Sequence, residues 1–390
     1  MKSDDNSSSS KNNKHKSKFA KFLKERQERK LFTFSTILIK FFCLIILLYL
    51  FMLSITLMGS AFKLFGKDFA RQLIATTSNP FIGLVIGILA TSIVQSSSTT
   101  TSIVVGMVGA NALSIANAIP IIMGANVGTS VTNILVSLGH ISRNMEFRRA
   151  FAASIVHDLF NTIAVLVFFP LQYYTNFLGI ISHSLAGMFQ NIGGLTVSSP
   201  IKVVTKPVIL LIEKITGHSG ILILIISLIL LFLTLRYLVK VLKSLIIGKF
   251  EVFFDKVIFK NAIIGLLFGL VITAFVQSSS ITTSLIVPLV GAGILTVEQI
   301  FPYTLGANIG TTVTAMLASM ATGNISAINV AFAHLCFNIL GVIFIYPFKI
   351  IPISLSKWMA KISIKSKIFP ILYIAIMFFI LPFLIIYFMR

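Results

Sequence analysis

The sequence is poor in charged residues and poorest in acidic ones. Of its 390 residues, 11% are charged, with 32 Lys and Arg against 11 Asp and Glu. A soluble domain usually carries about 25% charged residues, so the composition excludes an ordinary soluble protein. Cysteine is also scarce. Cys43 and Cys336 each lie in an apolar stretch, so they say nothing about the redox compartment.

Long apolar stretches dominate the rest of the chain. Hydrophobic residues make up 56% of it, and the mean hydropathy is +0.97. The stretches 33–58, 219–240 and 369–389 reach the roughly 20 residues that cross a bilayer. They are continuously apolar rather than alternating, which excludes an outer-membrane barrel. The sequence therefore predicts an all-α polytopic membrane protein in the plasma membrane, or in the inner membrane if it is bacterial.

The N-terminal residues 1–32 are polar and strongly basic. Ten Lys and Arg fall within residues 1–30, which is typical of a cytoplasmic segment under the positive-inside rule. We expect a disordered cytoplasmic tail, with attraction to anionic membrane lipid as a secondary role and no nucleic-acid partner. The segment is too long and polar for a simple cleaved signal, so 33–58 is expected to be a retained first span.

The chain contains an internal repeat. Residues 79–105, "NPFIGLVIGILATSIVQSSSTTTSIVV", recur as "NAIIGLLFGLVITAFVQSSSITTSLIV" at 261–287, an offset of 182 residues. At the same offset, "MGANVGTSVTN" at 123–133 recurs as "LGANIGTTVTA" at 305–315. A third pair, "HDLFN" at 157–161 and "HLCFN" at 334–338, is offset by 177. Such a series of matches indicates two halves built on one pattern.

The repeat predicts the organisation of the membrane domain. The expected units are a first repeat at 33–170 with a re-entrant helical hairpin at 79–110, an extracytoplasmic connector at 171–218, a second repeat at 219–347 with a hairpin at 261–293, and a cytoplasmic loop with a final span at 348–390. Each hairpin arm has only about 14 apolar residues, too few to cross alone. The other predicted spans are 113–138, 148–170, 299–320 and 325–347.

Three crossings per half would place the two repeats in inverted orientation. With a cytoplasmic N-terminus, the tail and the inner loops carry 23 Lys and Arg, against 6 in the outer loops. The inverted arrangement therefore agrees with the positive-inside rule. The weak point is the predicted outer loop 59–78, which is basic for an outside segment.

The polar segment Gln95–Ser98 and its repeat Gln277–Ser280 stand inside apolar sequence. We expect each segment to be the unwound tip of its hairpin. Paired interruptions in an inverted repeat point to a transporter's substrate site. Serine hydroxyls and backbone N–H groups at a half-helix N-terminus can hold an anion, while serine and glutamine oxygens can hold sodium. No Lys or Arg occurs at 79–138 or 261–315, so a bound anion would need a cation beside it.

The segments "GANVGTSVTN" and "GANIGTTVTA" have two interpretations, close helix packing and a sodium site. Their threonines are spaced three apart and share a helix face, which suits a pair of sodium ligands. His157 and His334 are expected to make structural hydrogen bonds. Asp158 has no acidic counterpart, since Leu335 stands there. A carboxylate within a span is a functional candidate, and the alternative is a structural pairing with Arg148 and Arg149.

The paired "QSSS" segments, the two Gly-Ala-Asn-Val/Ile-Gly-Thr segments and "EFRRAFAASIVHDLFN" at 146–161 resemble the type II sodium-dependent phosphate cotransporter family. The similarity covers about 79–170 and 261–347. It implies sodium-coupled import of inorganic phosphate by alternating access, with no enzymatic activity and no cofactor beyond the coupling sodium ions. The chain is shorter than animal relatives and has no cysteine pair in 171–218, which favours a microbial member.

The resemblance also implies roles for individual residues. Phosphate would be bound by Ser96, Ser97, Ser278 and Ser279, with Ser98 and Ser280 as further candidates. Sodium would be bound by Gln277, Ser278, Thr311 and Thr314, and the repeat adds Gln95, Asn126 and Asn308. In members that move net charge, an acidic residue matching Asp158 is linked to an additional sodium.

Other functions stay open at this point. A sodium-coupled carrier of another anion, either an organic anion or a phosphorylated metabolite, would use the same kind of site, although carboxylate carriers normally need a basic residue. An anion channel would not need sodium. A membrane-embedded serine hydrolase fits less well, because a duplicated hydroxyl cluster suits binding better than nucleophilic attack. The sequence also leaves a homo-oligomer open.

Overall fold

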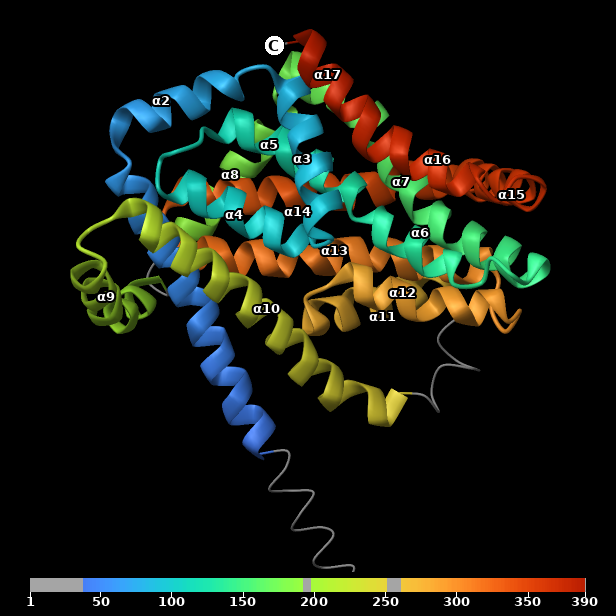
Figure 1. Cartoon of the computed structure of the whole chain (residues 1–390), viewed down its shortest axis with the longest axis horizontal. Coiled ribbons are helices and arrows are strands. Elements are labelled where there is room, and N and C mark those ends of the chain that lie inside the picture. The colour runs from blue at the N-terminus through green and yellow to red at the C-terminus, as the bar shows by residue number, and fades with distance from the viewer. Residues whose placement is uncertain (1–37, 192–197, 251–260, 390) are drawn as a thin grey trace, which may run out of the picture.

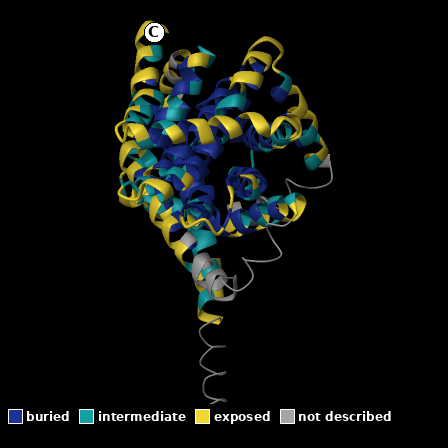
Figure 2. Ribbon diagram, turned by 90° about the vertical axis from the view of Figure 1, so that its right-hand side faces the viewer, coloured by how far each residue is buried: buried dark blue, intermediate teal, exposed yellow. Residues whose placement is uncertain are grey.

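The computed structural model describes residues 38–191, 198–250 and 261–389, and within these ranges it contains helices and no strands. The predicted tail 1–32 lies outside the described residues. Figure 1 shows the helices gathered in one body, with α13 and α14 running through its middle. Figure 2 shows buried residues in the interior and exposed residues on the outer helices.

In its described residues, the first half is helical at each predicted span. Its helices are Leu38–Leu64, α2 Gly66–Thr76, α3 Pro80–Val94, α4 Ser97–Gly109, α5 Ile115–Gly128, α6 Ser130–Leu138 and α7 Asn144–Thr175. The predicted span 113–138 is divided between α5 and α6 at Thr129. The span predicted at 148–170 is longer than expected, since α7 has 32 residues. The outer loop expected at 59–78 is largely helix α2.

After its first helix, the second half repeats the order of α3 to α7 with one exception. Its helices are α10 Gly220–Phe250, α11 Ala262–Val276, α12 Ser279–Gly291, α13 Val297–Thr322 and α14 Ile325–Ile345, followed by the 3-10 turn η2 Tyr346–Phe348. The exception is α13, which continues without interruption through the region where the first half divides into α5 and α6.

Two segments predicted as connections contain helices. The connector 171–218 holds α8 Phe177–Asn191 and α9 Ser198–Ile215, and α8 packs against α14. The loop 348–368 holds α15 Ile350–Lys365, which packs along α7. The prediction of a loop was wrong there because α15 has an apolar face that includes Ile353 and Met359, both buried. The loop was predicted from the number of lysines in this segment, and that number does not reveal the apolar face.

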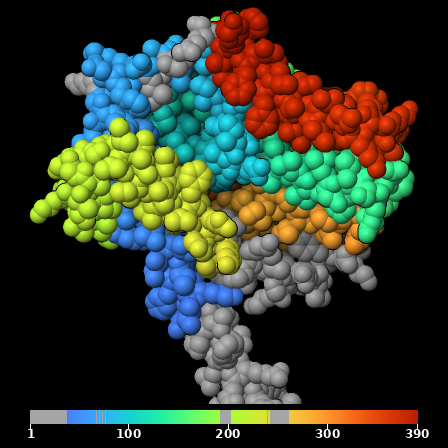
Figure 3. Space-filling model, in the orientation of Figure 1, coloured from blue at the N-terminus to red at the C-terminus, as the bar shows by residue number. Residues whose placement is uncertain are grey.

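The chain ends in a broken helix. It consists of α16 Phe369–Ala375, the π-helical turn η3 Ile376–Ile380 and α17 Leu381–Met389. Figure 3 shows this C-terminal part lying along the surface beside the segment that contains α6 and α7, and α16 contacts α6.

Within the described ranges, six helical stretches are long and apolar enough to cross a membrane. They are Leu38–Leu64, Ile115–Leu138, Asn144–Thr175, Gly220–Leu238, Ile325–Phe348 and Phe369–Met389. The span predicted at 299–320 forms a helix, α13, but its polar residues keep it out of this set. The multi-pass membrane class is therefore confirmed.

Glycines bring α3 against α5 and α11 against α13. A Cβ added to Gly124 would lie 1.9 Å from the carbonyl oxygen of Leu84, and one added to its repeat mate Gly306 would lie 1.9 Å from that of Leu266. At Gly87 and Gly269 the corresponding distances to facing carbonyl oxygens are 1.9 and 2.1 Å. Only glycine fits at such contacts. Close packing is thus confirmed for the glycines of the Gly-Ala-Asn segments.

Candidate substrate and ion site

The two polar segments break their helices in the same way. Gln95 ends α3 in the left-handed conformation, with φ 56° and ψ 29°, and Ser96 is extended, with φ −150° and ψ 101°. Gln277 and Ser278 have φ 56° and ψ 26°, and φ −151° and ψ 104°. The expected break is therefore confirmed, but it is shorter than predicted. Only the first two residues of each segment leave the helix, because the first serine already caps the helix that follows.

Each break is followed by a helix N-terminus that carries the remaining serines. The side chain of Ser96 accepts a hydrogen bond from the backbone N–H of Thr99 at 3.2 Å, and Ser278 accepts one from Ile281 at 3.4 Å. The next two serines of each copy are buried. They lie in the first turn, where backbone N–H groups have no partner within the helix and the helix dipole is positive.

The structure brings the two breaks together. The hydroxyl of Ser98 donates to the backbone carbonyl of Gln277 at 2.7 Å, although the residues are 179 positions apart. In Figure 1 the starts of α4 and α12 lie toward the middle of the molecule. Two helix N-termini thus meet where the sequence supplies neither Lys nor Arg. Chemically, this arrangement can surround an anion with hydroxyl and N–H groups.

The candidate sodium ligands of the second half are buried, and two of their oxygens are free. Gln277 is 6% exposed, and its Oε1 has no hydrogen-bond partner within the described ranges, nor has the Oγ1 of Thr314. Thr311 donates its hydroxyl to the carbonyl of Ala307 at 3.0 Å, which leaves its oxygen lone pairs available. Buried oxygens without donors suit a hard cation.

The equivalent residues of the first half differ. Thr129 donates to the carbonyl of Ala125 at 2.9 Å, and the Oγ1 of Thr132 has no partner among the described residues. Gln95, however, is exposed. The first break therefore offers fewer buried oxygen ligands than the second.

Asn126 and Asn308 hold the two halves together through a crossed network. The side chain of Asn126 forms hydrogen bonds with two residues of α14 in the second half. The side chain of Asn308 forms hydrogen bonds with two residues of α7 in the first half. The contacts are Asn126 with His334 at 3.1 Å and with Asn338 at 2.8 Å, and Asn308 with His157 at 2.6 Å and with Asn161 at 2.6 Å. All six residues are buried.

This network confirms that both histidines make structural hydrogen bonds. It also closes on the backbone, since Asn161 donates to the carbonyl of Asn126 at 3.0 Å and Asn338 donates to that of Asn308 at 3.3 Å. The carboxamides of Asn126 and Asn308 are thus engaged at both nitrogen and oxygen. Their assignment to sodium stays a prediction, and their visible contacts are between the halves.

Asn133 also lies at this site, although it was not among the residues predicted from the sequence. Its side chain donates to Thr283 Oγ1 at 2.8 Å and contacts His157 Nδ1 at 3.2 Å, so it joins α6 to α12 and α7. Its Oδ1 accepts from Thr283 at 3.0 Å and from Ser284 at 3.2 Å. The available signal was its spacing seven residues after Asn126, which places both on one helix face. Its repeat mate is Ala315.

Asp158 is 1% exposed and faces the C-terminal part of the chain. Its carboxylate accepts a hydrogen bond from the hydroxyl of Tyr373 in α16, and Ser130 lies beside the same carboxylate. The structural alternative, a pairing with Arg148 or Arg149, does not occur, because neither arginine forms an ion pair with Asp158. Arg148 stands ten residues earlier, about 15 Å along α7, and Arg149 donates instead to the carbonyl of Gly291 at 2.9 Å.

The comparisons with known proteins agree with this geometry. The family model of the Na+/Pi-cotransporters matches residues 50–196 and 230–384, one segment in each half. No solved structure matches the chain.

Among curated proteins, sodium-dependent phosphate transport protein 2B of Pongo abelii is 35% identical over 434 residues, which cover 86% of this chain and 63% of that protein. Sodium-dependent phosphate transport protein 2A of Rattus norvegicus is 35% identical over 440 residues, covering 92% and 69%. The 2A protein of Ovis aries is 36% identical over 417 residues, covering 86% and 65%. The chain spans less than two thirds of the first of these relatives. Since the family model matches most of both halves, the chain belongs to the Na+/Pi-cotransporter family.

Proposed function

We propose that this chain is a secondary active transporter that imports inorganic phosphate together with sodium by alternating access. The observation that carries this proposal is the contact between the two breaks, which joins two serine-bearing helix N-termini at one place. The family membership and the printed names of the relatives support phosphate and sodium as the transported species.

Phosphate would lie between the two breaks, held by Ser96, Ser97, Ser278 and Ser279. Ser98 and Ser280 complete the two clusters, and Ser98 also ties them together. Because neither repeat segment has a basic residue at this place, the charge of the anion is balanced by sodium. Coupling then follows from electrostatics, since neither charge enters a buried site cheaply without the other.

One sodium would be held in the second half by Gln277, Ser278, Thr311 and Thr314. The free oxygens of Gln277 and Thr314 support this assignment. A further sodium would lie at Asp158, a buried carboxylate with a tyrosine and a serine beside it and no basic partner among the described residues. Two sodium ions balance a divalent phosphate. A third makes the step electrogenic, and a potential of 100 mV then contributes about 2.3 kcal/mol per charge.

The proposed architecture has α3 with α4, and α11 with α12, as re-entrant hairpins within two inverted repeats. The backbone angles at Gln95 and Gln277, which agree within 3°, support the repeat. The excess of Lys and Arg in the tail and inner loops supports a cytoplasmic N-terminus.

The test is uptake of radiolabelled phosphate into proteoliposomes containing the purified chain. We expect uptake that requires an inward sodium gradient and is lost when choline replaces sodium. A panel of competing anions, including arsenate, sulfate, a dicarboxylate and a sugar phosphate, identifies the preferred substrate. Uptake that ignores sodium would contradict cotransport, and competition by the dicarboxylate alone would contradict phosphate.

A further inference from the structure

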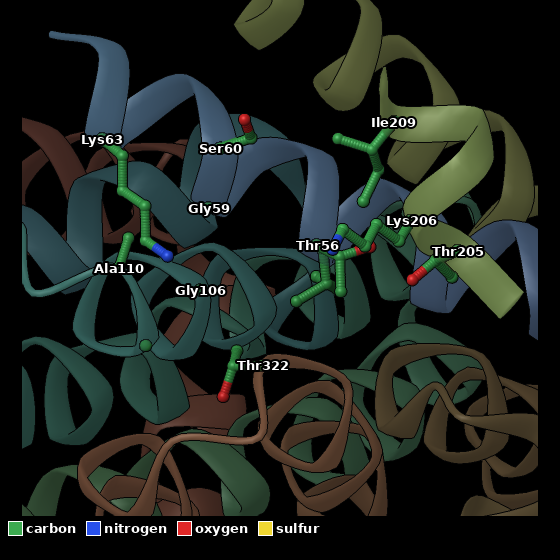
Figure 4. A pocket seen from close by; sticks show the side chains of 12 residues that line it. Thr56, Gly59, Ser60, Lys63, Gly106, Ala110, Thr205, Lys206, Ile209 and Thr322 are labelled. Atoms are coloured by element: carbon green, nitrogen blue, oxygen red, sulfur yellow. The ribbon is translucent and has the colours of Figure 1, made fainter. Parts of the chain in front are cut away.

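Two of the cavities in the described part of the chain are lined by basic residues. One lies beside α9 and the other beside α15, at opposite sides of the molecule in Figure 1. The first has a volume of about 310 Å³ and lies between the helix Leu38–Leu64, α9 and the C-terminal ends of α4 and α13. Figure 4 shows Lys63 and Lys206 reaching into it from two different helices. We call it the lysine cavity.

The lysine cavity has a sufficient structural explanation. Its wall includes Gly106 and Gly109 near the end of α4 and Thr322 at the end of α13. The C-terminal end of a helix carries unpaired carbonyls and a partial negative charge, which attracts lysine. Nothing else is needed to account for Lys63 and Lys206.

The second cavity is explained only in part in the same way. The C-terminal end of α12 lies in its wall and accounts for Arg149, which donates to the carbonyl of Gly291 there, but it does not account for Arg148. The cavity has a volume of about 410 Å³ and is lined by Arg148 and Arg149 from α7, Lys357 from α15, and Thr296 to Glu298 at the start of α13. We call it the arginine cavity. The N-terminal end of a helix carries a partial positive charge, so α13 adds to the positive potential of the basic residues rather than offsetting it.

The charges around the arginine cavity are not balanced. Its one acidic residue, Glu298, is paired with Lys357. Arg149 uses Nε to bond the carbonyl of Gly291 at 2.9 Å, and its guanidinium lies against Gly293. Arg148 is partly buried and forms no hydrogen bond or ion pair with any described residue. Two guanidinium groups therefore share a cavity without a carboxylate for either.

We propose that the arginine cavity is a second binding site for a phosphate group, separate from the site between the two breaks. Arginine binds phosphate oxygens through paired N–H donors. The start of α13 adds the positive end of its helix dipole, while a capping box between Thr296 and Gln299 uses two of the backbone donors there. A cavity of about 410 Å³ is large enough for a phosphate with an attached group. The ligand is a free phosphate ion or the headgroup of an anionic phospholipid. Basic pockets at the cytoplasmic ends of membrane helices suit such headgroups.

The site is tested by binding measurements that do not require transport. Equilibrium dialysis of purified protein with radiolabelled phosphate, in neutral detergent and choline buffer, detects a free phosphate ion. Thermal unfolding in nanodiscs of phosphatidylcholine, with or without phosphatidylglycerol, detects a headgroup. Both measurements omit sodium, so their result is independent of sodium-driven uptake. Binding can be absent while uptake is present, and binding can be present while uptake is absent.

The informative variant is Arg148→Gln, since Arg148 has no structural partner to lose. The matched control is Arg143→Gln, which removes one arginine at the same end of α7, where Arg143 pairs with Glu146 outside the cavity. We expect Arg148→Gln to weaken phosphate binding, or to remove the stabilisation by phosphatidylglycerol, by roughly tenfold in ligand concentration, the loss expected for charge-assisted hydrogen bonds. Arg149→Lys, which keeps the charge, should weaken it less.

If Arg148→Gln and Arg143→Gln behave alike with both ligands, the proposal is overturned. Binding of free phosphate alone assigns the site to the transported ion. Stabilisation by phosphatidylglycerol alone assigns it to lipid.

Discussion

The two halves of the molecule carry the same backbone break and surround it with different side chains. The angles at Gln95 and Gln277 differ by no more than 3°. Yet Gln95 is exposed, whereas Gln277 is buried with an unpartnered oxygen. The first half has Asp158 where the second has Leu335. Common backbone geometry suits a ligand held by both halves, and unequal side chains suit cations held by one half at a time.

The largest expected effect tests what the halves share. Gly124→Val and Gly306→Val should each abolish folded protein, because either side chain would overlap a facing backbone carbonyl and backbone cannot yield as a side chain can. Size-exclusion chromatography in detergent measures the folded fraction. Gly187→Val is the control, since a Cβ at Gly187 meets nothing within 4 Å. A folded Gly306→Val protein beside an unfolded Gly124→Val protein would show that the two halves are not packed alike.

The crossed asparagine network should also respond equally on both sides. Asn126→Ala and Asn308→Ala each remove the partner of the Nε2 atom of a buried histidine and of the side-chain oxygen of a buried asparagine in the other half. We expect a loss of about 2–4 kcal/mol in each variant, from roughly 1–3 kcal/mol per unsatisfied group. Urea or thermal unfolding in detergent gives the comparison. A large loss in one variant only would mean that the network is not symmetric in energy.

The glutamines should separate the halves. Gln277→Ala is expected to raise the sodium concentration for half-maximal phosphate uptake about tenfold, equivalent to about 1.4 kcal/mol, because it removes a buried oxygen ligand. Gln95→Ala, at the exposed counterpart, should raise it much less. The sodium dependence of initial uptake rates measures both. Equal shifts would contradict the assignment of this sodium to the second half.

Asp158 should affect charge movement more than uptake. Asp158→Asn keeps the shape of the side chain and removes its charge, so we expect uptake to continue with one charge fewer per phosphate and no response to membrane potential. Potassium–valinomycin gradients across proteoliposomes set the potential. Tyr373→Phe is the matched control, since it removes the hydrogen bond to Asp158 and leaves the carboxylate. An unchanged response in Asp158→Asn would end the assignment.

The sequence reveals the breaks because four polar residues interrupt an apolar run twice in register. It also reveals the glycine contacts, because Gly124 and Gly128 recur four residues apart at Gly306 and Gly310. Both features are local, and a local feature can be predicted from the spacing of residues within one segment. Only the repeat suggests that the copies are related in space, and no spacing states which histidine of one half meets which asparagine of the other.

Contacts between distant segments account for the remaining differences. Tyr373 reaches Asp158 across 215 residues, and nothing in the pattern of either segment marks the partner. The helix α15 was missed for a related reason. Its lysines suggested a loop, while the apolar face that makes it a helix is meaningful only against α7.

The glycine contacts have a mechanical consequence. Where peptide groups of α3 and α5 touch directly, as α11 and α13 also do, no rotatable side chain lies between them to absorb displacement. Each pair of helices should therefore move as one rigid body. Any rearrangement that opens the site to the other face of the membrane must then occur between these rigid pairs, at contacts whose hydrogen bonds can break and re-form. The hydrogen bonds between the asparagine and histidine side chains of the two halves are contacts of that kind.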